Sequence, residues 1–109
     1  MWNEIEESLK ELNITLSEYK KTQKDYAMKE YKYRTALSKR LIELRTAGQA
    51  VTHLLDIAKG MEDIAKLRFD RDIAEGLVKS AEEGINFYKL KIRELEAQHS
   101  REWGAAKFQ

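Results

Sequence analysis

Residues 64–95 read IAKLRFDRDIAEGLVKSAEEGINFYKLKIREL, and the spacing of the apolar side chains in this stretch decides the fold. Steps of three and four residues alternate along it without a slip, which is the heptad pattern of a helix that packs lengthwise against another helix. The pattern predicts a long helix from about residue 61 to residue 103, with Gly104 as its stop. Its positions are Ile64, Leu67, Arg71, Ala74, Val78, Ala81, Ile85, Tyr88, Ile92 and Leu95.

A second heptad pattern lies in the N-terminal half and predicts another long helix, from about residue 3 to residue 45. The chain contains no proline, and no glycine precedes Gly48, so nothing breaks this helix. Asn3, followed three residues later by Glu6, predicts an N-cap with a capping box. The heptad positions are Ile5, Leu9, Leu12, Leu16, Tyr19, Tyr26, Tyr33, Leu37 and Leu44.

Residues 46–60, here called the elbow, separate the two long helices and contain two glycines. We expect Gly48 to end the first helix, Thr52 to cap a short helix and Gly60 to end it. The predicted fold class is therefore all-α. We expect a single domain over residues 1–109, built as a long antiparallel, coiled-coil-like helical hairpin with the short helix at the elbow and a tail over residues 104–109.

The second long helix carries a further apolar stripe that a single partner helix cannot cover. A two-helix hairpin also buries too little surface for a chain of this size. We therefore predict a homodimer that forms a four-helix bundle, although the sequence does not decide between a dimer and a tetramer. The stripe that we assign to the oligomer interface consists of Phe69, Ile73, Leu77 and Phe87, with the small residues Gly76, Ser80 and Gly84 beside it.

Overall composition excludes several classes of protein. The absence of cysteine removes disulfides, thiolate metal sites and thiol nucleophiles, and no nucleophile lies beside a base. We expect no enzymatic activity, no cofactor and no metal. The acidic N-terminus and the lack of an apolar run of about 18 residues predict a cytoplasmic protein without a membrane segment.

Charge is unevenly distributed, although 20 basic residues nearly balance 19 acidic ones. Residues 20–45 hold nine basic and three acidic groups, a local charge of 9 − 3 = +6, interleaved with tyrosines. Two interpretations remain open: a nucleic-acid-binding surface, or an ordinary solvated helix face whose tyrosines lie in the heptad pattern. The residues of the nucleic-acid alternative are Lys20, Lys21, Lys24, Lys29, Lys32, Arg34 and Lys39.

Three smaller patterns have both a structural and a functional interpretation. Glu96 and His99 have the spacing of a di-metal bundle ligand pair, but the carboxylates that would complete it, Glu4, Glu7 and Glu11, are better explained as surface charge. The elbow has the outline of a helix-turn-helix, for which its short helix has too few residues, so a plain hairpin cap is favoured. Arg71 is a charge at a heptad position, and we expect it to fix the helix register or the oligomer state by pairing with the first helix, for example with Glu30.

Several segments of residues 30–104 together resemble a family of small helical proteins encoded by phages and prophages of Gram-positive bacteria. They are Leu41-Ile-Glu-Leu-Arg45, Gly48-x2-Val51-Thr52, Asp56-Ile-Ala-Lys-Gly60, Ala65-x-Leu-Arg-Phe, Arg71-Asp-Ile-Ala, Leu95-Glu-Ala-Gln and Arg101-Glu-Trp103. The resemblance implies a host-cell cytoplasmic setting near replication and recombination functions, and it supplies no catalytic motif.

The function predicted from these features is a protein-interaction module, an accessory or modulator of a replication, recombination or host-defence component. Its partners would be a second copy of the chain and another, unidentified protein. The alternative is a nucleic-acid-binding accessory protein that uses residues 20–45. The predicted protein contacts are Gln49, His53 and Lys59 at the elbow and Phe108 in the tail.

Overall fold

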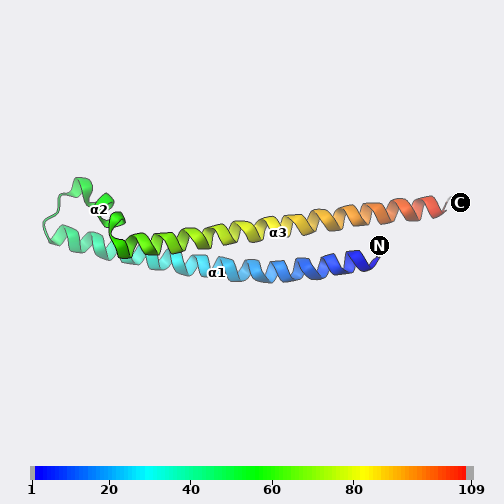
Figure 1. Ribbon diagram of the computed structural model, residues 1–109, viewed down its shortest axis with the longest axis horizontal. Helices are drawn as coiled ribbons and strands as arrows, with labels where there is room; N and C mark the ends of the chain where they lie inside the picture. The colour runs from blue at the N-terminus through cyan, green and yellow to red at the C-terminus, as the bar shows by residue number, and fades with distance from the viewer. Residues whose placement is uncertain (1, 108–109) are drawn as a thin grey trace. The chain divides into compact units, whose positions relative to one another are not determined.

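The computed structural model describes residues 2–107, with side chains over residues 2–104, and it is all-helical (Figure 1). The long helices are α1 (Trp2–Thr46) and α3 (Glu62–Lys107). Between them lie the 3₁₀ turn η1 (Val51–His53) and the short helix α2 (Leu54–Gly60). No β-strand occurs in the described part of the chain. The predicted fold class and the order of the helices are therefore confirmed.

The chain divides into two compact units, and both long helices contribute to each of them. The elbow unit contains residues 22–78, and the terminal unit contains residues 1–21 and 79–109. In the elbow unit the ion pairs Arg40–Asp63 and Glu30–Arg71 join α1 to α3. Because the α3 partner advances along the chain as the α1 partner recedes, the two segments within this unit are antiparallel.

The core of the elbow unit combines α1, α2 and α3. Ile64, at the start of α3, is the largest fully buried side chain described, with 1% of its surface exposed. Leu54 and Ala58, one helical turn apart, are the buried residues of α2. Tyr33 of α1 is also buried, together with Ala74 and Val78 farther along α3. Ile64, Tyr33, Ala74 and Val78 occupy predicted heptad positions, and Leu54 and Ala58 belong to the apolar side chains of the elbow helix. Burial of apolar surface therefore holds the elbow unit together.

The C-terminus of α1 ends as the position of Gly48 predicts. Gly48 has a φ of +92°, in the left-handed region that glycine adopts without a Cβ clash. Its N–H donates to the carbonyl of Arg45 at 3.1 Å, and the N–H of Gln49 donates to the carbonyl of Leu44 at 3.1 Å. These two hydrogen bonds form a Schellman motif, which satisfies carbonyls that the helix end would otherwise leave unpaired.

Three other predicted helix ends are wrong. Asn3 lies inside α1, which begins at Trp2, and the Trp2 indole N–H donates to Glu6 at 2.9 Å. Thr52 lies within η1 and caps no helix, because His53 occupies the N-cap of α2 without a side-chain hydrogen bond. Gly104 does not end α3, which continues to Lys107. A single glycine lowers helix propensity by only about 1 kcal/mol, and a long helix tolerates that.

The terminal unit pairs α1 and α3 through smaller side chains than the heptad pattern predicts. Ser8 is buried, whereas Leu9 and Leu16, both predicted in the interface, have 44% and 38% of their surface exposed. A Cβ added to Gly84 would lie only 3.2 Å from Thr15 Cγ2. The helices thus approach closely at Thr15. Gly84, predicted beside the oligomer interface, instead faces α1 within the chain.

The Arg40–Asp63 ion pair gives the elbow unit a predicted pH dependence. The hydrogen bond from Arg40 holds the pKa of Asp63 below its ordinary value. A carboxyl whose folded pKa is depressed stabilises the fold above its unfolded pKa of about 4, and this contribution is lost as the pH falls through the folded value. We expect Asp63→Asn to lower the thermal midpoint at pH 7 and to leave it unchanged at about pH 2.

Circular dichroism melts at the two pH values measure this effect. Glu94→Gln, which removes an exposed carboxylate from the same helix, is the control and should change neither midpoint. A loss of stability in Asp63→Asn that is equal at both pH values contradicts the ion-pair explanation.

Candidate functional site

The main candidate site is an exposed apolar face on α3 in the elbow unit. Phe69, Ile73 and Leu77 follow one another at four-residue steps, so they lie on one side of the helix. Their exposed fractions are 56%, 50% and 51%, although each is a large apolar side chain. The prediction that pairing of α1 with α3 leaves these residues uncovered is correct. We call these three residues the apolar face of α3.

Charged side chains border this face. Ile73 and Leu77 line a shallow depression of about 130 Å³ together with Asp25, Lys29 and Asp70. The charges there are paired, because Lys29 lies 2.8 Å from Asp25 and Lys66 lies 2.8 Å from Asp70. Lys66 Nζ also lies 5.0 Å from the centre of the Phe69 ring, within the range of a cation–π contact. An apolar strip with a rim of paired charges is the usual anatomy of a protein–protein contact.

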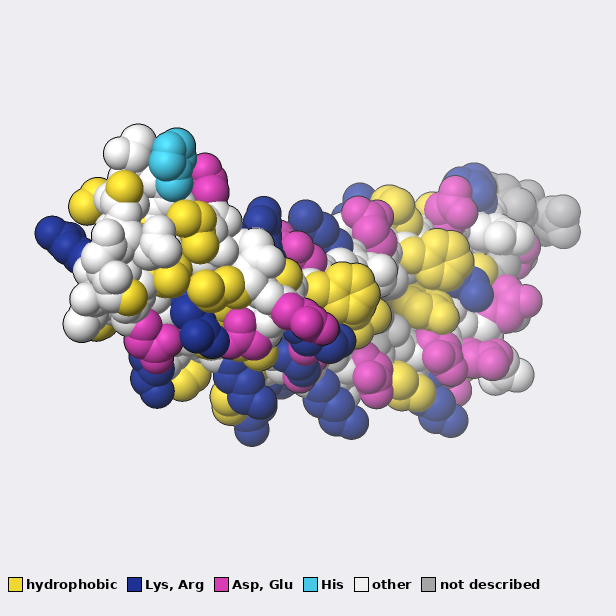
Figure 2. All heavy atoms as spheres, turned by 60° about the vertical axis from the view of Figure 1, so that its left-hand side comes forward, with side chains coloured by type: hydrophobic (Ala, Val, Ile, Leu, Met, Phe, Trp, Pro, Cys, Tyr) yellow, Lys and Arg dark blue, Asp and Glu magenta, His cyan; other side chains and the backbone are white. Residues whose placement is uncertain are grey.

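Phe87, the fourth residue predicted for the oligomer interface, belongs to the terminal unit. It is 59% exposed and packs edge-on against Tyr88, with ring centres 5.1 Å apart. Leu90, one turn farther along α3, is equally exposed. Hydrophobic side chains that reach the surface are visible in Figure 2. The terminal unit therefore also carries uncovered apolar surface on α3.

Arg71 connects α3 to α1 in the elbow unit. Its Nη1 lies 3.5 Å from Glu30 Oε2, and its Nη2 donates to Asp72 at 2.8 Å. Its guanidinium lies 4.6 Å from the centre of the Tyr33 ring. The hydrogen bond to Asp72 holds the pKa of Arg71 above its ordinary value. The predicted contact of Arg71 with Glu30 is confirmed. The Arg71 guanidinium is thus held by Glu30, Asp72 and the Tyr33 ring.

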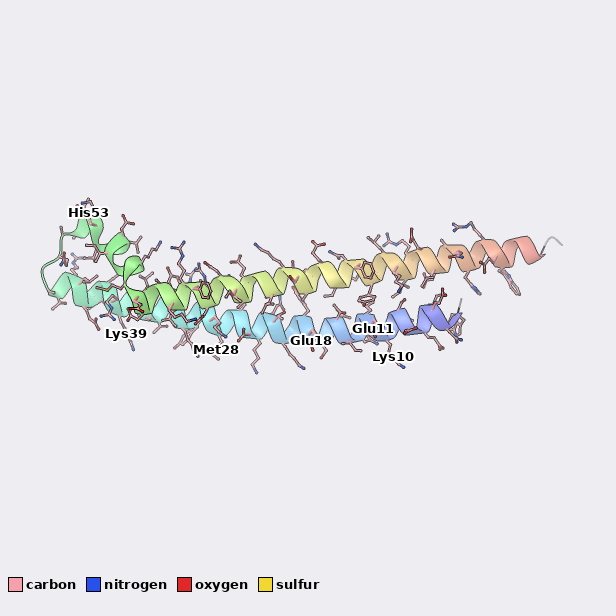
Figure 3. The ribbon with its side chains drawn as sticks, in the orientation of Figure 1. Lys10, Glu11, Glu18, Met28, Lys39 and His53 are labelled. Atoms are coloured by element: carbon pink, nitrogen blue, oxygen red, sulfur yellow. The ribbon has the colours of Figure 1, made fainter. Side chains whose placement is uncertain are left out.

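The elbow residues predicted for protein contact differ in burial. Gln49 and His53 are exposed, and His53 is labelled on η1 in Figure 3. Lys59 is half-buried and lines a groove of about 380 Å³ with Leu55 and Arg71. Neither Gln49 nor His53 lines this groove. Phe108 lies outside the described residues. Lys59 therefore differs from the other two predicted contact residues, which are exposed and do not line the groove.

The carboxylates near the N-terminus line a different groove. Glu4, Glu7 and Glu11 surround an opening of about 520 Å³ with Ser8, Tyr88 and Lys91. Neither Glu96 nor His99 is among its lining residues. Within the described part of the chain, no three His, Cys, Asp or Glu side chains are grouped so that they could hold a metal ion.

Some of the basic residues of α1 are paired within the helix and others are not. Lys20, at the start of the predicted basic set, is exposed and belongs to the terminal unit. Lys21, Lys29 and Arg34 each have a carboxylate from their own helix within 4 Å, namely Glu18, Asp25 and Glu30. In the part of α1 that belongs to the elbow unit, four exposed basic residues form no ion pair with any described residue: Lys24, Lys32, Lys39 and Arg45.

Apolar heptad positions alone miss three exposed residues on the same helix. Met28, Tyr31 and Ile42 are 50%, 68% and 67% exposed. Met28 lies four residues after Lys24, and Ile42 lies three residues after Lys39. Tyr31 lies eight residues before Lys39, so all three residues are on the outer side of α1. Figure 3 shows Met28 and Lys39 on the side of α1 that faces away from α3. The sequence signals their exposure, because they do not share the heptad positions that Tyr26 and Tyr33 occupy.

Comparisons with protein-family models, curated proteins and solved structures find no match for this chain. No described helix is both long enough and apolar enough to cross a bilayer. The geometry itself therefore defines the class: an all-helical chain with exposed apolar and basic surfaces.

Proposed function

We propose that this chain is a non-enzymatic, self-associating protein-interaction module. The observation that supports the proposal is the apolar face of α3, formed by Phe69, Ile73 and Leu77, each half or more exposed. Contiguous apolar surface with a polar rim marks protein interaction sites on chains of this kind.

A second copy is the partner that fits this face best. The four-residue spacing of its side chains gives a straight strip along a helix, and the same strip on another copy is complementary to it in shape and polarity. Packing two such strips around a two-fold axis brings four long helix segments together, which is the arrangement of a four-helix bundle. The charges that border the strip are already paired within the chain, so contact there leaves few unpaired charges to desolvate.

The resemblance of residues 30–104 to phage-encoded helical proteins supports a wider form of this proposal. In that form, the dimer acts as an accessory or modulator of a replication, recombination or host-defence component of the infected cell. The exposed residues Gln49 and His53 remain available to such a partner, because they lie on the elbow, apart from the apolar face of α3.

Sedimentation equilibrium tests self-association. We expect the wild-type chain to be dimeric and Ile73→Gln to weaken the dimer. Ile73 already has half of its surface buried, so the substitution forfeits about 0.8–1.5 kcal/mol of apolar burial per copy. A symmetric dimer contains the change twice, a loss of about 1.6–3 kcal/mol, which predicts a dissociation constant about 15- to 150-fold larger.

Ile42→Gln is the matched control, because it makes the same chemical change at an exposed position on α1. It should leave the dissociation constant unchanged. A wild-type chain that sediments as a folded monomer at every concentration contradicts the proposal, and so does an Ile73→Gln variant that dimerises as tightly as the wild type.

A further inference from the structure

The outer side of α1 in the elbow unit carries positive charge that the fold does not neutralise. This segment of α1 contains three carboxylates, and each of them is already paired: Asp25 with Lys29, Glu30 with Arg34 and Arg71, and Glu43 with Arg40. Four exposed cations remain without an ion pair in the described residues: Lys24, Lys32, Lys39 and Arg45.

The spacing of these cations suits an extended polyanion. Lys24 and Lys39 are separated by about 22 Å along the helix axis, at about 1.5 Å per residue. Lys32 lies between them, and Arg45 extends the series toward the elbow. In Figure 2, which is turned about the vertical axis from Figure 1, Lys and Arg side chains gather along the lower edge, on the side of α1. Backbone phosphates along one strand present negative charge over a comparable length.

Tyr31 adds a flat surface between the cations. Its side chain is 68% exposed, whereas Tyr33, two residues later, is buried against α3. An exposed tyrosine beside lysines can stack on a nucleic acid base, but only where the face of the base is open. Bases in a duplex are stacked on one another, so this aromatic residue favours a single strand.

We propose that the outer face of α1, comprising Lys24, Tyr31, Lys32, Lys39 and Arg45, binds single-stranded nucleic acid. The lysines and Arg45 contact phosphates, and Tyr31 stacks on one base. This activity is separate from self-association, because the apolar face lies on α3 and contains none of these residues.

Fluorescence anisotropy with a labelled oligothymidylate, longer than the ~4–16 nucleotides that a small single-strand site covers, tests the proposal. The full-length chain should bind at low salt. The logarithm of its affinity should fall with the logarithm of the salt concentration with a slope of about −3, since each of four phosphate contacts contributes about −0.7. A duplex of the same length should bind more weakly.

Two variants separate the two kinds of contact. The triple variant Lys24→Gln, Lys32→Gln and Lys39→Gln should reduce the slope to about −1, because it leaves a single phosphate contact. Tyr31→Ala should weaken binding about 5- to 150-fold without changing the slope, as expected for the loss of one stacked base.

The matched control is the triple variant Lys10→Gln, Lys89→Gln and Lys91→Gln, with all three positions in the terminal unit. Both triple variants have a formal charge of 1 − 3 = −2, so net charge cannot distinguish them. The control should bind like the wild type.

Three results overturn the proposal: no binding at low salt, an equal loss in both triple variants, or tighter binding of the duplex together with a silent Tyr31→Ala. Circular dichroism of each variant confirms that its helices are intact. The Ile73→Gln variant is measured in the same assay. If it binds the oligonucleotide while its dimer is weakened, failure to dimerise and failure to bind are distinct.

Discussion

Ile64→Ala is expected to lower the free energy of unfolding by about 2–4 kcal/mol. Ile64 has 1% of its surface exposed and is the largest fully buried side chain in the described part of the chain. Truncation removes buried methyl and methylene groups and leaves a cavity that surrounding helices fill only in part. The loss is large for a domain whose core is the narrow contact between helices.

Urea denaturation at a fixed protein concentration measures this change, since the stability of a self-associating chain depends on concentration. Ile42→Ala is the control: Ile42 is 67% exposed on α1, and alanine has the higher helix propensity. It should be neutral or slightly stabilising. Equal destabilisation by the two substitutions is inconsistent with a core centred on Ile64.

The buried positions of α3, Ile64 among them, could be predicted because the apolar heptad spacing is the dominant pattern in this helix. In residues 64–95 the apolar spacing is regular, no proline interrupts it, and a large aliphatic residue occupies most heptad positions. Ala74, Val78, Ile85 and Ile92 are buried as the pattern predicts. These buried residues all lie on the helix face that the heptad spacing defines, so local and tertiary preferences agree there.

The first helix shows where such a pattern misleads. The interface position that follows Ile5 can lie four residues on, at Leu9, or three residues on, at Ser8. The same choice follows Leu12, between Leu16 and Thr15. Apolar character favours the leucines, but the structure buries Ser8. At Thr15 the two helices are so close that a Cβ on Gly84 would lie 3.2 Å from Thr15 Cγ2. Steric fit between two helices is a tertiary property that a one-helix pattern does not contain.

The candidate sites were predictable to different degrees. The apolar face of α3 could be predicted because Phe69, Ile73 and Leu77 are surplus to the heptad positions. The neutralisation of Lys29 and Arg34 was harder to predict, since a charge count assigns +6 to residues 20–45 without saying which cations are paired. Side-chain pairing within one turn, as between Lys29 and Asp25, reduces that excess and leaves a smaller basic set.

Arg71→Ala is expected to lower the free energy of unfolding by about 2 kcal/mol. The substitution removes the contact of the guanidinium with the Tyr33 ring, worth about 0.5–2 kcal/mol, and a partly exposed ion pair with Glu30, worth up to about 1 kcal/mol. Both partners belong to α1, so the loss falls on the contact between the helices. Glu30→Gln, which keeps the side-chain size, should have a smaller effect because Arg71 retains Asp72 and Tyr33.

A double-mutant cycle of Arg71→Met and Glu30→Gln separates these contributions by urea denaturation. Methionine preserves apolar contact with Tyr33 but removes the charge, so the coupling energy reports the ion pair and should be about 0.5–1 kcal/mol. Zero coupling, with Arg71→Met as unstable as Arg71→Ala, contradicts any role for the Arg71–Glu30 ion pair. If the ion pair fixes the register, the double variant should retain most of its stability but unfold with a smaller m-value, because alternative registers then become populated and the transition is less cooperative.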